Sequence, residues 1–176
     1  MNSAKPIALL LIYSFFLLTS VPANNNTAND HIYKQAQELL AAMTLDEKVS
    51  LLSGRGSYDT QNIDRLNIPS LQLWDGPNGV RSNNNEPTTA FPVGISMGAT
   101  WNPELIERLG IALGKECRAL GVEVLLGPTV NIIRTPLNGR NFETYSEDPY
   151  FNGVLSVAYV KGLQSEHVGA SVKHFI

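Results

Sequence analysis

Four side chains that could bind a polar ligand stand at or just beyond the ends of apolar segments. Asp75 comes directly after one such segment, Arg140 lies in the irregular stretch after another, and Lys173 and His174 stand at the end of a third. A carboxylate, a guanidinium, an ammonium and an imidazole together accept and donate hydrogen bonds, and the charged ones do so strongly. These residue types therefore suit a polyhydroxylated ligand.

Each of these residues also has a purely structural interpretation. Asp75 precedes a glycine and can start a tight turn. Arg140 can pair with Glu143 or Asp148 on a loop surface, where an ion pair contributes little to stability. His174 can be a hydrogen-bonded histidine of the core. The shared location favours function, because parallel α/β folds bind ligands at the carboxyl ends of their strands.

Several other kinds of site are absent from the sequence. The 176 residues carry a net charge of −3 and no basic cluster, so nucleic acid is not an expected partner. A single cysteine excludes an internal disulfide framework and a cysteine-rich metal site. The three histidines lie on unrelated segments, so no metal and no other cofactor is expected. A Gly-x-Ser-x-Gly elbow, a P-loop and the glycine-rich turn of dinucleotide-binding folds are also missing.

Apolar strands alternate with amphipathic helices from residue 66 onward, which predicts an α/β fold with a parallel sheet and helices outside it. The predicted strands are residues 70–74, 91–100, 122–126 and 169–175. Residues 55–65 and 82–89 are predicted to be exposed loops. Residues 127–146 form a long irregular segment, of the kind that usually carries function.

Capping residues indicate where the first two helices begin and end. Asp30 is expected to cap a helix that runs to about Met43. Thr44 opens a second, short helix, in which Glu47 three residues later completes a capping box. Gly54 is expected to end this helix in the left-handed conformation.

Two longer helices are predicted further along the chain. Asn102 and Pro103 start one that ends at Gly121, and Asp148 starts another that ends at about residue 166. Cys117 falls on the apolar stripe of the first of them, so we expect a buried core residue. A reactive, exposed thiol is the alternative.

The N-terminal residues have the pattern of a secretory signal peptide. Lys5 supplies a positive charge, residues 7–19 are almost wholly apolar, and small residues precede a cleavage point after Ala23. An uncleaved membrane anchor is the alternative, but the apolar run is short for a bilayer span. We therefore expect residues 1–23 to be removed and residues 24–30 to form a polar linker. The mature protein is then secreted, extracellular or periplasmic, without stable membrane association.

A series of short segments carries a resemblance to a known family. They are residues 41–48 (AAMTLDEK), 74–81 (WDGPNGVR), 99–105 (ATWNPEL), 126–132 (LGPTVNI), 139–143 (GRNFE), 146–150 (SEDPY) and 173–175 (KHF). In this order they resemble glycoside hydrolase family 3, and the sequence is similar to the N-terminal part of a secreted β-glucosidase of that family. The resemblance extends from about residue 36 to the last residue.

The resemblance implies a fold, a ligand and a set of binding residues. The fold is a (β/α)8 TIM-type barrel, of which residues 31–176 form the N-terminal portion up to about the fourth strand. Asp75, Arg140, Lys173 and His174 match the positions that hold the terminal sugar of a β-linked glucoside or oligosaccharide. A sugar that lacks one of the bound hydroxyls would leave polar groups of the site unpaired, which is how such sites discriminate.

The resemblance also implies that the catalytic carboxyl groups are missing. Retaining hydrolysis needs a nucleophile and an acid/base about 5 Å apart, and both are expected beyond Ile176. Asp75 is not assigned as nucleophile, because the matching position binds substrate, and Glu143 is expected to support the loop. We therefore expect the chain alone to be inactive and, with an open barrel edge, poorly soluble or partly unfolded.

Three other functions remain open. The first is a secreted carbohydrate-binding remnant that holds sugar without hydrolysing it. The second is the β-N-acetylglucosaminidase branch of the family, in which Pro-Gly normally follows Lys-His-Phe, whereas Ile176 follows here. The third is a β-xylosidase. The oligomeric state is not indicated by the sequence.

Lys173 and His174 raise a geometric question. Adjacent side chains in a regular strand face opposite ways. If both reach one sugar, the backbone must depart from extended geometry, and we predict a kinked or unusual peptide bond at this strand end.

Overall fold

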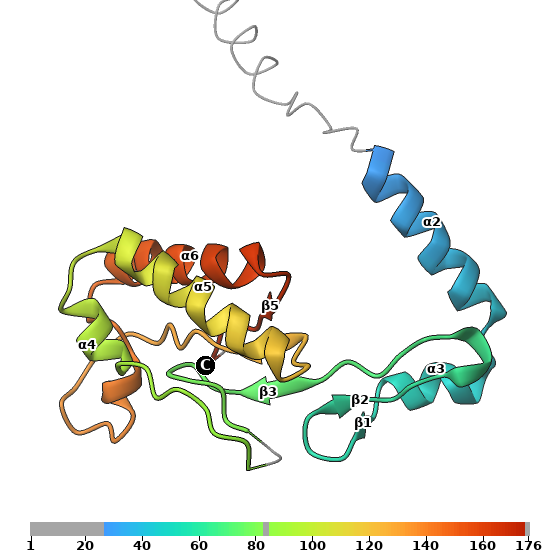
Figure 1. Ribbon diagram of the computed structural model, residues 1–176, viewed down its shortest axis with the longest axis horizontal. Helices are drawn as coiled ribbons and strands as arrows, with labels where there is room; N and C mark the ends of the chain where they lie inside the picture. The colour runs from blue at the N-terminus through green and yellow to red at the C-terminus, as the bar shows by residue number, and fades with distance from the viewer. Residues whose placement is uncertain (1–26, 83–84, 175–176) are drawn as a thin grey trace, which may run out of the picture. The chain divides into compact units, whose positions relative to one another are not determined.

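The computed structural model describes residues 27–82 and 85–174, whose helices and strands are shown in Figure 1. The chain divides into two compact units, Met1–Met43 and Thr44–Ile176, and each is described by itself. The predicted signal peptide at residues 1–23 lies outside the described residues.

The first unit contains helix α2, Thr27–Ala42. This helix begins before Asp30, which lies in its first turn, so the prediction that Asp30 caps the helix is wrong. An acidic side chain in the first turn interacts favourably with the helix dipole. An aspartate therefore indicates the start of a helix whether it stands at the cap or, as Asp30 does, in the first turn. Residues 27–30 of the predicted linker are helical. In the described part of the chain, no helix has both the length and the apolar character needed to cross a bilayer.

The second unit runs from a short capped helix into a parallel α/β arrangement. Its helices and 3-10 turns are α3 Leu45–Leu51, η1 Asp64–Leu66, α4 Gly94–Gly98, α5 Pro103–Ala119, η2 Asn141–Glu143 and α6 Pro149–Ser165. Its strands are β1 Gly54–Arg55, β2 Asp59–Thr60, β3 Leu73–Asp75, β4 Val124–Leu126 and β5 Gly169–Ala170.

Helix α3 begins as predicted and ends differently. The Thr44 hydroxyl accepts from the Glu47 N–H at 3.2 Å, and the Glu47 carboxylate accepts from the Thr44 N–H at 2.8 Å, which confirms the capping box. The helix ends at Leu52, which stays in the right-handed region, so Gly54 is not its terminator. Gly54 instead pairs with Thr60 in the antiparallel hairpin of β1 and β2. The segment predicted as a loop at residues 55–65 therefore contains a short hairpin.

Strands β3, β4 and β5 form a parallel sheet in that order. Leu73 pairs with Val124, and Leu125 pairs with both Trp74 and Ala170. Three of the four predicted strands are thus confirmed, although each is shorter than expected. Because the strands are parallel, their carboxyl ends lie along the same edge.

The fourth predicted strand, residues 91–100, is wrong, because this segment contains helix α4. An apolar run of this length does not distinguish a strand from a short buried helix. Gly94 lies against the backbone at Glu143, the last residue of η2. Gly98, one helical turn further along α4, lies against the backbone at Tyr145. Only a residue without a Cβ allows so close an approach.

Helix α5 ends as predicted, at Gly121. The Gly121 N–H donates to the Arg118 carbonyl at 3.3 Å, and the Val122 N–H donates to the Cys117 carbonyl at 2.9 Å. These are the two hydrogen bonds of a Schellman motif, which needs a left-handed residue. Gly121 has a φ of 76°, so it meets this requirement without the strain that a side chain would add.

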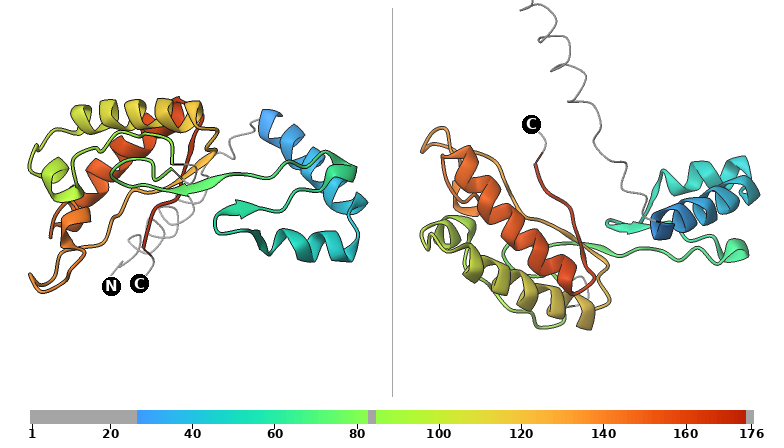
Figure 2. Two further views of the ribbon diagram at one scale, coloured as in Figure 1. Left: turned by 60° about the horizontal axis from the view of Figure 1, so that its bottom comes forward. Right: turned by 90° about the horizontal axis from the view of Figure 1, so that it is seen from above.

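The hydrophobic core joins the sheet to helices α5 and α6, which lie side by side (Figures 1 and 2). Both helices start at their predicted caps, where Asn102 accepts from the Leu105 N–H and Asp148 accepts from the Phe151 N–H. The buried side chains at the centre of this core are Trp74 and Leu125 of the sheet, Ile106, Leu113 and Cys117 of α5, and Leu155, Tyr159 and Leu163 of α6. Packing of this core holds the carboxyl edge of the sheet in place.

Cys117 is fully buried, which confirms the expected core position. Burial raises the pKa of its thiol to about 12, and the neighbouring Glu116 acts in the same direction. Because the thiolate is the reactive form, we expect no labelling of the native chain by iodoacetamide, and complete labelling in guanidinium chloride. Intact-protein mass spectrometry before and after denaturation measures both. Fast labelling of the native chain would contradict the buried position.

Candidate functional site

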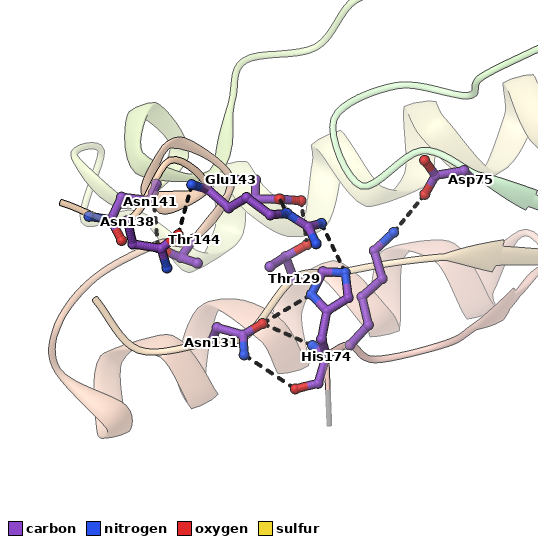
Figure 3. Close-up of polar contacts among 10 residues, drawn as sticks. Asp75, Thr129, Asn131, Asn138, Asn141, Glu143, Thr144 and His174 are labelled. Atoms are coloured by element: carbon purple, nitrogen blue, oxygen red, sulfur yellow. Dashed lines mark hydrogen bonds and ion pairs between the residues drawn. The ribbon is translucent and has the colours of Figure 1, made fainter. Parts of the chain in front are cut away.

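The four predicted site residues form two contacting pairs near the carboxyl ends of the strands, and Figure 3 labels one member of each pair, Asp75 and His174. Asp75 is the last residue of β3, and Arg140 directly precedes η2. Lys173 and His174 follow β5, and strand pairing continues up to them, because Lys173 forms a parallel bridge with Thr129. The structure thus brings together all four residues that the sequence singled out.

Asp75 and Lys173 form an ion pair. The ammonium donates to Asp75 Oδ1 at 2.6 Å, across 98 residues of sequence. The side chains are 32% and 19% exposed, respectively. The pair therefore lies partly out of solvent and connects the carboxyl ends of the two outer strands.

Arg140 is held by two partners. Its Nε donates to Glu143 Oε1, and its Nη2 lies 3.0 Å from His174 Nε2. The other oxygen of Glu143 accepts from the Thr129 hydroxyl at 3.1 Å. The Glu143 side chain is only 7% exposed, whereas that of Arg140 is 59% exposed. The pairing of Arg140 with Glu143 is thus present, with the carboxylate buried and the guanidinium largely exposed. That Glu143 supports the loop and takes no part in the chemistry stays a prediction.

The loop around Arg140 is fixed by its own hydrogen bonds and by helix α4. The Arg140 N–H donates to Asn138 Oδ1 at 3.0 Å, and Asn141 Nδ2 donates to the Thr135 carbonyl at 2.7 Å. The two glycines of α4 lie directly against the backbone at Glu143 and at Tyr145. A short helix that sequence analysis mistook for a strand therefore positions the arginine.

Asn131 belongs to the motif at residues 126–132, but the sequence alone assigned it no role in the candidate site. Its Oδ1 accepts from the His174 backbone N–H at 2.9 Å and lies 3.1 Å from His174 Nδ1. Its Nδ2 donates to the His174 carbonyl at 3.2 Å. In Figure 3 these contacts join Asn131 to His174. The available signal was a polar side chain shortly after the carboxyl end of β4, but nothing in the sequence named its partner 43 residues away.

A small cavity of about 210 Å³ lies on this network. Its lining residues are Thr129, Asn131, Ile132, Asn138, Arg140, Glu143, Thr144 and His174. Asp75 is not among them, and in the view of Figure 3 it lies across His174 from Asn131. The cavity is therefore lined by Arg140 and His174 of the four predicted residues, and not by Asp75 or Lys173.

The peptide bond between Lys173 and His174 is cis. The predicted departure from regular geometry at this strand end is thus confirmed. The Lys173 side chain contacts Asp75, and the His174 side chain contacts Arg140 and Asn131. That both side chains bind one sugar stays a prediction.

The two titratable groups at the centre of the network have shifted pKa values. Burial by itself would raise the pKa of Glu143, but hydrogen bonds from Arg140 and Thr129 outweigh it and lower the pKa below its ordinary value of 4.5. Burial lowers the pKa of His174 below 6.5, and the positive charges of Arg140 and Lys173 add to this, against the opposing effect of Glu143 and Asp75. The native site therefore favours a charged Glu143 and a neutral His174.

These shifts predict that acid destabilises the chain in two stages. As pH falls through 6.5, the unfolded state takes up a proton at His174 that the native state resists, and below 4.5 the same holds for Glu143. Both contributions are present at neutral pH and are lost as pH drops through the native pKa values. Urea unfolding at a series of pH values should show both stages. His174→Gln should lack the loss of stability that begins below pH 6.5, and Glu143→Gln should lack the loss that begins below pH 4.5. A variant that still shows the loss assigned to its residue would contradict the assignment.

Within residues 27–82 and 85–174, no cluster of three or more histidine, cysteine, aspartate or glutamate side chains is arranged to hold a metal ion. The expectation that no metal or cofactor is required stays a prediction.

Residues 18–176 match the Glycosyl hydrolase family 3 N terminal domain. The chain is 51% identical over 143 residues to a beta-glucosidase of Rhizobium radiobacter, and the match covers 79% of this chain and 18% of that protein. It is 46% identical over 149 residues to thermostable beta-glucosidase B of Acetivibrio thermocellus, covering 79% of this chain and 20% of that protein. The chain thus spans about a fifth of the length of these relatives.

Solved structures give the same result. Beta-glucosidase 3B from Thermotoga neapolitana, in complex with alpha-D-glucose, matches with a TM-score of 0.74 at 44% identity, over 80% of this chain and 23% of that one. A beta-glucosidase from Kluyveromyces marxianus, in complex with glucose, matches with a TM-score of 0.77 at 43% identity, over 79% of this chain and 17% of that one. Sequence and backbone agree over most of the chain, and we conclude that it belongs to glycosyl hydrolase family 3.

Proposed function

We propose that this chain supplies part of the sugar-binding site of an enzyme that hydrolyses terminal, non-reducing β-D-glucosyl residues with retention of configuration. The observation that carries the proposal is the placement of Asp75–Lys173 and Arg140–His174 as neighbouring pairs at one sheet edge. The names of the relatives, all beta-glucosidases, give the sugar and the linkage.

Each of the two pairs has a hydrogen-bonding atom without a partner among the described residues, and these atoms suit hydroxyl groups. Lys173 uses one N–H on Asp75 Oδ1, and among the described residues no hydrogen bond involves Asp75 Oδ2. The Nη1 of Arg140 has no partner among these residues either. One carboxylate oxygen can therefore accept from a sugar hydroxyl while the two cations donate to neighbouring oxygens.

Neither carboxylate of the site is suited to the covalent chemistry. Asp75 is paired with Lys173, and Glu143 is paired with Arg140 and nearly buried. A retaining mechanism needs two carboxyl groups about 5 Å apart, one as nucleophile and one as acid/base. We propose that both come from other parts of the whole enzyme, which in the relatives is about five times as long as the matched segment.

A second function is favoured by the same observation. With both carboxylates of the site bound to cations, the 176-residue chain by itself is a sugar-binding module that does not hydrolyse its ligand. This second function is tested on the chain alone, which should bind glucose and give no turnover of an aryl β-glucoside. Absence of glucose binding would contradict it.

A graft tests the hydrolytic function. Residues 31–176 replace the matching segment of the Rhizobium radiobacter beta-glucosidase, with which the chain shares 51% identity. The grafted enzyme should hydrolyse an aryl β-glucoside and prefer it to the corresponding β-xyloside and N-acetyl-β-glucosaminide. The parent enzyme, purified in parallel, is the control for folding. A folded graft without β-glucosidase activity, or with a preference for another sugar, would contradict the proposal.

We also propose that the chain is exported and that its sheet is part of an eight-stranded (β/α) barrel. The N-terminal charge, apolar run and small residues support export. The parallel order of β3, β4 and β5 with helices between them supports the barrel. Expression with residues 1–23 intact should release a protein whose first residue is Asn24, as read by N-terminal sequencing. An unprocessed, cell-associated chain would contradict export.

A further inference from the structure

The contacts of Asn131 determine its amide orientation. A backbone N–H can only donate and a backbone carbonyl can only accept. The His174 N–H points at one atom of the Asn131 amide and the His174 carbonyl accepts from the other, at 2.9 and 3.2 Å. The first atom must therefore be the oxygen, and Asn131 presents an acceptor to the imidazole ring.

Both sides of the imidazole then require the same tautomer. Nδ1 faces the Asn131 oxygen at 3.1 Å, so a hydrogen bond there needs a proton on Nδ1. Nε2 faces Arg140 Nη2 at 3.0 Å, and a guanidinium nitrogen is always a donor, so Nε2 must accept. A neutral ring with its proton on Nδ1 satisfies both contacts, and no other protonation state does.

This tautomer limits what a ligand can do at His174. Nε2 has a single lone pair, which Arg140 uses in the free site. A group that enters between the two residues must accept from the guanidinium and donate to the imidazole. A hydroxyl does both, whereas an ether, a carbonyl or a fluorine can only accept.

We propose that Asn131 is a positioning residue that makes His174 a hydrogen-bond acceptor, so that one sugar hydroxyl bridges Arg140 and His174. The hydroxyl accepts from Arg140 Nη2 and donates to His174 Nε2. This inference rests on the proposed function in one respect, namely that the ligand is a sugar.

The tautomer can be measured without any ligand. In the grafted enzyme with ¹⁵N-labelled histidine, two-bond ¹H–¹⁵N correlation spectra should show a protonated Nδ1 and a bare Nε2 for His174, whose signals are assigned by their loss in His174→Gln. In an Arg140→Met background, where no guanidinium donates to Nε2, Asn131 alone should keep Nδ1 protonated, and Asn131→Ala should then give a mixture of tautomers. Asn131→Asp keeps an acceptor oxygen at the same place, so it should restore the single tautomer, and its negative charge should raise the pKa of His174. A purely structural role of Asn131 would not move these ring signals.

A matched control is available away from the cavity. Asn62→Ala makes the same chemical change at an asparagine whose side-chain contacts are to Arg55 and Asp64. It should leave the Nδ1 and Nε2 signals of His174 unchanged. If Asn131→Ala does not fold, the unmodified graft and Asn131→Asp decide the tautomer. A protonated Nε2 in the unmodified graft would overturn the inference.

Sugar analogues test the bridging hydroxyl. Glucose and its monodeoxy and monodeoxyfluoro analogues are titrated into the labelled graft, with the His174 ring signals as the readout. At one ring position, both analogues should bind about tenfold more weakly or worse, because the deoxy sugar makes neither hydrogen bond of the bridge and the fluorinated sugar cannot donate to His174 Nε2. Asn131→Ala should reduce this loss at that position only. If every fluorinated analogue binds as tightly as glucose, the bridge is overturned.

The outcomes separate this inference from the proposed function. A bare Nδ1 with normal glucose binding overturns the role of Asn131 and leaves the sugar site standing. The expected tautomer in the graft without glucose binding overturns the proposed function and with it the bridge.

Discussion

Asp75→Asn in the grafted enzyme is expected to lower kcat/KM for an aryl β-glucoside by about two to three orders of magnitude. The amide leaves the Lys173 ammonium without its counter-charge, and breaking a buried pair in this way costs about 3–5 kcal/mol, less when the pair is partly exposed as here. It also weakens the acceptor that faces the sugar. Steady-state kinetics on the graft measure the loss, with the parent enzyme carrying the equivalent change as reference.

The control for this prediction is the same substitution at an exposed aspartate. Asp46 lies in the first turn of α3 and is exposed, so Asp46→Asn should leave the activity close to that of the graft. A double-mutant cycle with Lys173→Met adds a second test. Because Asp75 and Lys173 are in direct contact, the double variant should lose less than the sum of the two single losses. Additive losses, or an active Asp75→Asn graft, would show that the pair does not act as a unit in binding.

Gly94→Ala is expected to destabilise the grafted enzyme by about 2–3 kcal/mol, the upper part of the range for overpacking a close contact. A Cβ at this position would overlap the Glu143 carbonyl, which belongs to the backbone and cannot rotate away. Gly98→Ala should act similarly, because its Cβ would overlap the Tyr145 carbonyl. Urea unfolding measures the change, and both variants should also weaken glucose binding through displacement of Arg140.

Helix α6 offers a matched glycine as control. A Cβ at Gly153 would meet no atom within 4 Å, and this position is exposed and helical. Gly153→Ala should therefore stabilise the grafted enzyme by about 0.5–1 kcal/mol through helix propensity alone. If Gly94→Ala were also neutral or stabilising, the close packing of α4 on the loop of Arg140 would be refuted.

The helix ends could be predicted from the sequence because their hydrogen bonds are local. The capping box of Thr44 and Glu47, the cap at Asn102 and the Schellman motif at Gly121 each involve residues within a few positions of one another. The physical rule that selects the residue is then contained in the sequence itself. Asp30 shows the limit of this rule, since an acidic residue suits both the cap and the first turn.

The conformations of the segment 91–100 and of Gly54 could not be predicted, because they depend on contacts outside the local sequence pattern. An apolar run with glycines is compatible with a strand and with a buried helix, and here the backbone at Glu143 and Tyr145 selects the helix. Gly54 is suited to a helix end, but its pairing with Thr60 places it in a hairpin. In both cases the deciding contact comes from a segment that the local pattern does not include.

The same distinction between local pattern and distant contact applies to the candidate site. The sequence by itself determined which residues carry the charges, that they stand at strand ends, and which family they resemble, because residue type and order are properties of the chain. Tertiary structure alone decided the partners: Lys173 on Asp75 across 98 residues, Arg140 on His174 across 34, and Asn131 on His174 across 43. Hydrogen bonds depend on the distance and direction between two groups, and only the packing of the sheet, α4 and the loop brings these groups within reach.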